Sequence, residues 1–391
     1  MDLALDDIAA ASARAARDLG AHVSGDVVAR DAAAEFSREG WKELAAGGLT
    51  GLSIPTRYGG RGATAVTAVA TLAALGETCT DNGLLFAMGA HLWACADPIA
   101  RCGSEAQKQK WLPGLCDGSL IGAHAASEKD AGSDAAAIRT TARRVGGQWR
   151  LDGAKTFVTN APHADLFLVT AVTDPDQGTM GISMFLVPRT TAGLSVGEPI
   201  SKSGLRTAAM AEVTLQGCVV GDEALLGPAG AGMGIFTSTM TRERSFILAP
   251  AVGTLTRLVE RCFTYARQRR QFGTAIADFQ AVSHSIADMR MRAETARLLA
   301  FQVGWLTDRQ RVRPHDAAMV KLHLSEALLA SALDAVRIHG GYGYAAELGL
   351  ERMVRDAMGA ALYSGTSDIQ RNLIARARIV GPAVSGGATE A

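Results

Sequence analysis

The chain has 391 residues, of which 48% are hydrophobic, so it is long enough for two or three domains with sizeable cores. Basic and acidic residues balance at 39 each, which gives a formal net charge of +0. This balance argues against a nucleic-acid binder, which usually carries a basic excess.

Four Ala-rich segments in the first third have apolar residues spaced three or four apart, as on one face of a helix. Gly and Pro lie between them, as in IPTRYGGRG (54–62). The apolar run near 65–75 is interrupted by Thr and is too short to span a bilayer, so we expect no membrane span. The pattern predicts helices over residues 3–19, 31–47, 63–76 and 82–101.

The pattern changes between about 123 and 225, where short apolar or alternating runs stand between turn residues. Such runs are typical of strands. We therefore predict a compact β domain of barrel or sandwich type. The predicted strands are WRLDGAKTFVTN (149–160), DLFLVTAVT (165–173), GISMFLVP (181–188) and AEVTLQGCVV (211–220).

Helical spacing returns after Gly232 and continues almost to the end of the chain. The first of these helices, over 234–269, contains Pro250, which should kink it. The small, polar tail at 381–391 is expected to be poorly ordered. Further helices are predicted over 278–307, 314–340 and 348–360, and another after Thr366.

This order of helices, strands and helices predicts an α+β chain of three domains. We place the N-terminal helical domain at 1–122, the middle β domain at 123–232 and the C-terminal helical domain at 233–391.

Cysteines and the N-terminus indicate a cytoplasmic protein. The six Cys form no CxxC pair, so neither a disulfide framework nor a zinc site is expected. The first residues are acidic at Asp6 and Asp7, unlike the basic start of a signal peptide. The histidines show no metal-binding spacing such as HExxH, so we expect no metal.

Seven strings carry a resemblance to one family. They are GLTGLSIPTRYGG (48–60), GSEAQKQKWLPGLCDG (103–118), ASEKDAGSD (126–134), GAKTFVTNA (153–161), RRQFGT (269–274), IHGGYGY (338–344) and YSGTSDIQRNLIA (363–375). In this order they resemble the acyl-CoA dehydrogenase family over nearly the whole chain. The resemblance implies a C-terminal four-helix bundle, an FAD cofactor, and a homodimer or homotetramer with flavin sites at subunit contacts.

Two of these strings supply flavin contacts from the β domain. Ser127 and Ser133 match family hydroxyl contacts, although a polar turn would have the same composition. Phe157 stands where many relatives have a Trp against the flavin, and Thr159 matches a further hydroxyl contact. The alternative for Phe157 is a core aromatic on a plain strand.

The string RRQFGT implies contacts to the FAD of a neighbouring subunit. Arg269, Gln271 and Phe272 match the residues that reach this cofactor. Arg suits a pyrophosphate because its planar fork donates two parallel hydrogen bonds. The alternative is a solvated helix end, which we accept for Arg267 and Arg270.

Two more strings place the remaining cofactor contacts at helix ends. Gly340 and Gly341 permit close backbone approach to a ligand, while Arg337 replaces the family's usual Gln. Thr366 is a candidate N-cap beside the cofactor's phosphates. Asp368 replaces a neutral Gln there, and its charge would repel a phosphate.

The catalytic base is the most informative departure from the family pattern. Most members carry a Glu just before GTS, where this chain has Ser364, and a serine hydroxyl is too weak a base. A smaller branch, including the isovaleryl and long-chain enzymes, has its Glu on an earlier helix, at the position of Glu243. Arg244 then matches the family's substrate-side Arg. The alternative for Glu243 is a solvated helix turn between Arg242 and Arg244.

The substrate region departs from the family as well. Thr241 stands where members often have an Asp against the pantetheine arm, which hints at a carrier other than CoA. Ser364 before GTS, together with the Arg-Glu-Arg run at 242–244, resembles dehydrogenases of natural-product pathways, including prolyl oxidases that make pyrrole units on carrier proteins.

Three functions remain open from the sequence. The first is α,β-dehydrogenation of an acyl thioester on CoA or a carrier protein, with an electron-transfer flavoprotein or oxygen as electron acceptor. The second is a flavin-dependent oxidase or hydroxylase acting on a carrier-bound acyl group. The third is a flavin-binding relative that has lost its base.

Overall fold

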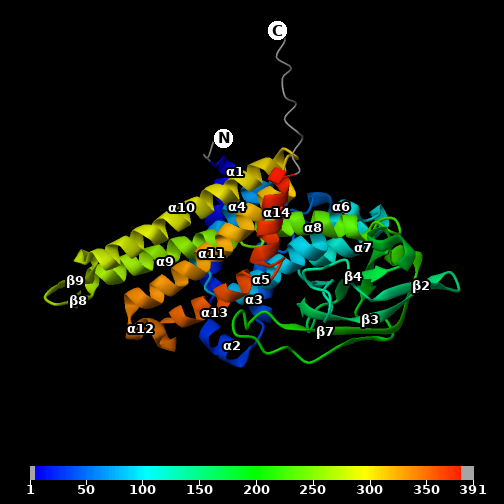
Figure 1. The fold of residues 1–391 in the computed structure, drawn as a ribbon, viewed down its shortest axis with the longest axis horizontal. Coiled ribbons are helices and arrows are strands. Elements are labelled where there is room, and N and C mark those ends of the chain that lie inside the picture. Colours follow the sequence, from blue (N-terminus) through cyan, green and yellow to red (C-terminus); the bar gives the residue numbers. More distant parts are fainter. Residues whose placement is uncertain (1–4, 380–391) are drawn as a thin grey trace, which may run out of the picture.

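The computed structural model describes residues 5–379, so the tail at 381–391 lies outside the described residues. A β sheet lies at one end of the molecule, and the long helices extend away from it to the other end (Figure 1). One apolar core joins the N-terminal and C-terminal helices, while the interior face of the sheet has a core of its own.

The N-terminal helices follow the predicted order with two corrections, one of which is a further helix, Glu105–Cys116, that was not predicted. The predicted helix 31–47 is two helices, because Ala34 adopts a left-handed φ of 54° and ends the first. Ser37 then caps the second by accepting a hydrogen bond from Gly40 N at 3.0 Å. The helices are α1 (Asp7–His22), α2 (Val27–Ala33), α3 (Arg38–Ala46), α4 (Ala65–Thr78), α5 (Asn82–His91), α6 (Asp97–Cys102) and α7 (Glu105–Cys116), with a π-helical turn at Leu92–Ala96.

One helical run, Asn82–Cys102, is apolar and long enough to cross a membrane by length and composition alone. Its apolar window is 89% buried inside the protein, where it forms part of the helical core.

The middle region forms one sheet of seven strands in the order β1-β4-β2-β3-β7-β6, with β5 paired to β4. Side chains alternate between the two faces, as the period of a strand requires. Leu166 and Leu168 of β4 join the helical core, while Phe167 and Val169 fill the sheet's own core. The strands are β1 (Gly122–Ala125), β2 (Thr141–Val145), β3 (Gln148–Thr159), β4 (Leu166–Val172), β5 (Ile182–Pro188), β6 (Leu194–Val196) and β7 (Met210–Val220).

The C-terminal helices also require one correction. The predicted helix 234–269 does not kink at Pro250 but breaks at Leu248, and Pro250 lies in the first turn of the next helix, where its missing N–H costs nothing. Gly253 lets this helix pack closely on α4, since a Cβ there would lie 1.9 Å from Ala73 O. The elements are α8 (Gly232–Phe246), α9 (Ala249–Gln268), β8 (Arg270–Gln271), β9 (Thr274–Ala275), α10 (Gln280–Asp308), α11 (Pro314–His339), α12 (Gly341–Tyr344), α13 (Leu350–Ala360) and α14 (Ser367–Ile379).

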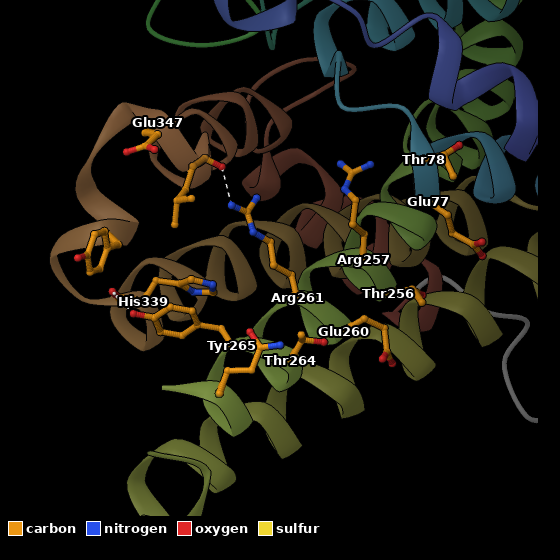
Figure 2. Close-up of a pocket in the computed structure, with 13 residues that line it drawn as sticks. Glu77, Thr78, Thr256, Arg257, Glu260, Arg261, Thr264, Tyr265, His339 and Glu347 are labelled. Atoms are coloured by element: carbon orange, nitrogen blue, oxygen red, sulfur yellow. Dashed lines mark hydrogen bonds between the residues drawn. The ribbon is translucent and has the colours of Figure 1, made fainter. Parts of the chain in front are cut away.

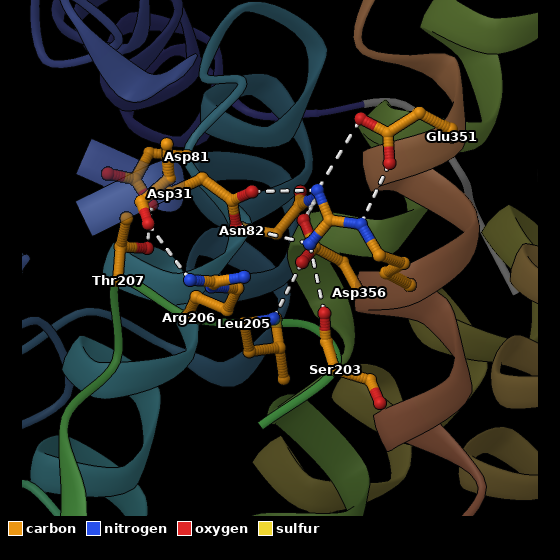
Figure 3. A network of polar contacts seen from close by, with 11 residues as sticks. Asp31, Asp81, Asn82, Ser203, Leu205, Arg206, Thr207, Glu351 and Asp356 are labelled. Atoms are coloured by element: carbon orange, nitrogen blue, oxygen red, sulfur yellow. Dashed lines mark hydrogen bonds and ion pairs between the residues drawn. The ribbon is translucent and has the colours of Figure 1, made fainter. Parts of the chain in front are cut away.

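A polar network fixes the loop between β6 and β7 against the helices (Figure 3). Asp356 of α13 accepts hydrogen bonds from Leu205 N at 2.6 Å and from Asn82 at 2.9 Å. Thr207 donates to buried Asp81 at 2.5 Å. The network therefore holds the β sheet in a fixed position relative to α5 and α13.

Candidate active site

Glu243 is a buried carboxylate on α8 that meets Ser364 from the other end of the C-terminal region. Its side chain is 7% exposed, and Oε1 accepts a hydrogen bond from Ser364 Oγ at 2.5 Å. Burial raises the pKa of Glu243, while the Ser364 hydroxyl and the charges of Arg244 and Lys321 act against that rise. Glu243 is therefore not the solvated helix-turn residue of the alternative interpretation.

Three side chains donate hydrogen bonds to the backbone carbonyls of the short loop at Ser364 and Gly365. Ser364 has a left-handed φ of 55°, which is unfavourable for a non-glycine residue. Arg244 Nε donates to Ser364 O at 2.9 Å, Lys321 Nζ to Gly365 O at 2.7 Å, and Gln370 Nε2 to Gly365 O at 2.8 Å. These bonds hold the Ser364 hydroxyl against Glu243.

Lys321 and Gln370 were not identified from the sequence, although both are fully buried beside this loop. Burial and, to a smaller extent, the charge of Arg244 lower the pKa of Lys321 to about 8, while the charge of Glu243 opposes this change. A signal for Lys321 was present in the sequence. It lies on the apolar face of α11, between Ala317 and Leu324, where a charged residue is rare.

Phe157 is not a core aromatic of the sheet, which was the alternative interpretation of this residue. It is 62% exposed and has a left-handed φ of 54°, at a register shift between β3 and β7. Such strain persists where the surroundings impose it and clusters at ligand sites. Thr159 follows on the same strand and is partly buried.

A buried ion pair braces the segment that carries Ser127. Lys155 Nζ lies 2.8 Å from Glu128 Oε1 and donates to Ala126 O at 3.1 Å. Ser127 O accepts a hydrogen bond from Thr156 N at 2.9 Å. The Ser127 side chain lines a small cavity that reaches Met233 and Phe236 of α8, whereas Ser133 is exposed on the same segment.

Helix α5 contacts both the end of β3, where Thr159 lies, and the loop at Ser364 and Gly365. Asn160, which follows Thr159, donates to Ala87 O at 2.9 Å. The neighbouring Phe86 packs on Tyr363 with ring centroids 4.3 Å apart, and Tyr363 precedes Ser364. The structure therefore brings the β-domain contacts close to the Glu243 region.

A second group of predicted cofactor residues lies far away, at the end of α9 and α11. The Arg269 guanidinium lies 6.0 Å from the Tyr342 ring centre, and Tyr342 follows Gly341. Phe272, in the β8–β9 turn, is 96% exposed. Figure 1 places this hairpin at the end of the molecule opposite the sheet. Gln271, Arg337 and Gly340 belong to the same group and are also exposed.

The length of α9 separates the two groups within one chain. This helix has 20 residues, or about 30 Å at 1.5 Å per residue, between the Glu243 region and Arg269. The two groups therefore do not meet in a single chain, as expected if the second contacts the cofactor of a neighbouring copy.

Thr366 and Asp368 lie at the start of α14. Thr366 Oγ1 accepts a hydrogen bond from Ile369 N at 3.3 Å, which agrees with the predicted N-cap. Asp368 is exposed and lies 3.5 Å from Arg371, which offsets part of its charge.

Two larger cavities open on the surface. One, of about 860 Å³, lies between α9, α11 and α12 and is lined by Arg261, Tyr265 and His339 (Figure 2). Among the predicted site residues none lines it. The other, of about 660 Å³, runs along α8 and is lined by Thr241 and Arg242, beside Glu243 in sequence.

Comparison with known proteins agrees with this geometry. The chain matches the acyl-CoA dehydrogenase N-terminal domain over residues 9–119, the middle domain over 123–218 and the C-terminal domain over 230–379. It is 44% identical over 342 residues to an L-prolyl-[peptidyl-carrier protein] dehydrogenase of Pseudomonas fluorescens, covering 87% of this chain and 90% of that protein.

Solved structures give the same result. The crystal structure of the prolyl acyl carrier protein oxidase AnaB superposes with a TM-score of 0.94 at 41% identity, over 95% of this chain and 99% of that one. A structure of PigA with FAD and proline superposes with a TM-score of 0.93 at 38% identity, over 96% of this chain and 98% of that one. The chain belongs to the acyl-CoA dehydrogenase family.

Proposed function

We propose that this protein is an FAD-dependent dehydrogenase that oxidises an L-prolyl group held as a thioester on a peptidyl carrier protein. The observation that carries the proposal is the bond between Glu243 and Ser364. Ser364 occupies the position of the family's usual Glu, so the Glu243 carboxylate on α8 lies next to the position where most members carry their base. Two similar proteins whose names include a prolyl carrier protein support the substrate class.

Residues of the described chain fit a bound flavin. Phe157 offers an exposed ring at a strained position, and the Ser127 segment faces α8 across a small cavity. His124 Nε2 and Gln370 Oε1 are buried and have no hydrogen-bond partner among residues 5–379. Unpartnered buried polar atoms of this kind indicate a ligand or water that completes the site. FAD, when bound, would accept the β-hydrogen of the substrate as a hydride.

The chain's own residues supply the base and its positioning. Ionised Glu243 takes the proton from the carbon next to the thioester carbonyl, and burial makes this carboxylate a stronger base than one in water. The Ser364 hydroxyl directs one carboxylate oxygen, while Arg244 and Lys321 hold the Ser364 loop in place. Buried surroundings keep water away from the reacting carbon.

The assembly and location are part of the same proposal. We assign Arg269, Gln271, Phe272, Arg337, Gly340 and Gly341 to the cofactor of a neighbouring copy in a homodimer or homotetramer. All six cysteines are free thiols, which supports a cytoplasmic location. The similarity to prolyl carrier-protein enzymes supports a place in a natural-product pathway. The reduced flavin would pass its electrons to an electron-transfer flavoprotein or to oxygen.

The test is anaerobic bleaching of the bound flavin by matched acyl groups. Prolyl and butyryl groups are each presented on CoA and on a peptidyl carrier protein. Bleaching by the prolyl carrier protein alone supports the proposal, whereas comparable bleaching by acyl-CoA assigns the enzyme to CoA substrates. Absence of bleaching by every thioester indicates an inactive relative. Oxygen uptake measured with the same substrates separates an oxidase from a dehydrogenase.

A further inference from the structure

The cavity along α8 is an open groove that leads toward the reaction centre. One face of the helix lines it over two turns, through Gly234, Thr237, Ser238 and Thr241. Thr241 is followed on the same face of α8, three residues later, by Arg244, whose Nε donates to Ser364 O at 2.9 Å. The groove also shares Met233 with the small cavity that contains Ser127. A substrate arm lying in this groove would therefore approach the Ser364 loop, which contacts Glu243, and the segment that carries Ser127.

Arginines form one wall of the groove. Asp97, which is 4% exposed, lies 2.6 Å from Arg101 Nε and 3.3 Å from Arg242. Arg101 also donates to Ser238 Oγ at 2.5 Å. These contacts fix two cationic side chains beside the groove.

The rim of the groove carries more positive charge. Val312 and Pro314 line the groove; Val312 belongs to the loop between α10 and α11, and Pro314 is the first residue of α11. This loop contains Arg309, Arg311 and Arg313, all exposed. The Arg313 side chain is 73% exposed, so the charges face solvent at the entrance.

The carboxylates of Asp308 and Asp316, at the two ends of this loop, accept hydrogen bonds from backbone N–H groups. Asp308 accepts hydrogen bonds from Ala65 N at 2.6 Å and Val66 N at 3.1 Å, at the start of α4. Asp316 accepts one from Arg313 N at 2.9 Å and approaches Arg313 Nε only to 3.8 Å. Arg309 stacks on Trp305 at 4.1 Å, and Arg311 forms no ion pair with any residue in 5–379.

We infer that this arginine loop, Arg309–Arg313, is the docking surface for the acidic face of the carrier protein, whose thioester arm enters the groove along α8. The inference rests on the proposed function and names the surface that its partner uses. Exposed arginines at a rim act mainly by steering an oppositely charged partner, and such steering raises association rates by about 10- to 1,000-fold at low salt.

The test compares two substrates that carry the same prolyl thioester. One is an acidic peptidyl carrier protein loaded with L-proline, and the other is prolyl-pantetheine, which has no protein face. We expect Arg311→Glu, and more strongly Arg309→Glu/Arg311→Glu, to lower kcat/KM for the carrier protein by about 10-fold or more at low salt. Activity on prolyl-pantetheine should change less than about 2-fold, because the loop does not touch the reaction centre.

Two control variants sharpen the comparison. Lys42→Glu makes the same charge change at an exposed position of α3 and should leave activity on both substrates unaffected. Arg309→Lys/Arg311→Lys keeps the charge and should retain most of the carrier activity. Equal losses on both substrates, or unchanged carrier activity in Arg309→Glu/Arg311→Glu, would overturn the docking surface. If the wild-type protein oxidises neither substrate, the proposed function itself fails.

Discussion

Removing the hydroxyl of Ser364 should move the pH dependence of catalysis in a defined direction. Glu243 accepts protons only when ionised, so the rate rises with pH through its pKa. The hydrogen bond from Ser364 stabilises the ionised form, and its loss in Ser364→Ala raises the pKa further. A hydrogen bond to a charged group contributes about 1.5–3 kcal/mol, and about 1.4 kcal/mol corresponds to one pKa unit. The acid limb should therefore shift to higher pH by about 1 to 2 pH units.

The assay is the anaerobic rate of flavin bleaching by the prolyl carrier protein, measured against pH for wild type and variant. Ser245→Ala is a matched control, since Ser245 is buried on the same helix but donates to Thr241 O at 2.8 Å, away from Glu243. Its acid limb should stay at the wild-type pH. An unmoved limb in Ser364→Ala, or one displaced to lower pH, would refute the assignment of the Ser364 hydroxyl.

Three further outcomes follow from the same contacts. Phe157→Ala should weaken flavin binding by about 2- to 12-fold in a fluorescence titration, because an aromatic contact contributes about 0.5–1.5 kcal/mol, while Tm changes little since the ring is exposed. Lys321→Met should lower activity without lowering the free energy of unfolding at pH 7. The folded protein lowers the pKa of Lys321 from 10.5 to about 8, so below pH 8 the buried charge reduces the free energy of unfolding by about 3 kcal/mol. This reduction disappears as the pH rises from about 8 toward 10.5. A loss of stability above about 2 kcal/mol for Lys321→Met in a denaturant titration at pH 7 would contradict this. Arg269→Ala and Glu243→Gln should each be inactive alone but regain activity when co-assembled, because one mixed site then has both wild-type residues; no recovery in mixed oligomers would argue against shared sites.

The order of elements was predictable because apolar spacing distinguishes helices from strands over long segments. Helix α7 was nevertheless missed, and two predicted helices are divided at positions that apolar spacing does not reveal. Ala34 reverses its backbone between two helices, and Leu248 interrupts a pattern that continues on both sides. In both cases the decisive feature is the conformation of one or two residues, for which the sequence offers no Gly.

For the candidate site, the most informative sequence signal was the replacement of one residue by another at matched positions. The absence of a Glu at Ser364 and the presence of Glu243 predicted a base on α8, and the hydrogen bond between them supports that prediction. The sequence marks Lys321 as an unusual charge on an apolar helix face, but it does not show what Lys321 or Gln370 contacts, because both donate to the backbone carbonyl of Gly365. Such contacts depend on tertiary packing that no local pattern records.

The residues proposed to contact the substrate and its carrier were only partly predictable from the sequence. The replacement at Thr241 predicted a change of carrier, but the basic rim near it depends on how the α10–α11 loop folds back toward α8. The three arginines of that loop look like an ordinary solvated turn in the sequence. Their position beside the groove gives them a separate role in the proposal.

The identity of the base is the central claim, and Glu243→Gln tests it most directly. This change keeps the size of the side chain and removes its basicity. We predict that anaerobic flavin bleaching by the prolyl carrier protein slows by about 100- to 10,000-fold while flavin remains bound, and that Glu243→Gln/Ser364→Glu recovers part of the rate. Bleaching at the wild-type rate in Glu243→Gln would show that another group removes the proton and would contradict the account.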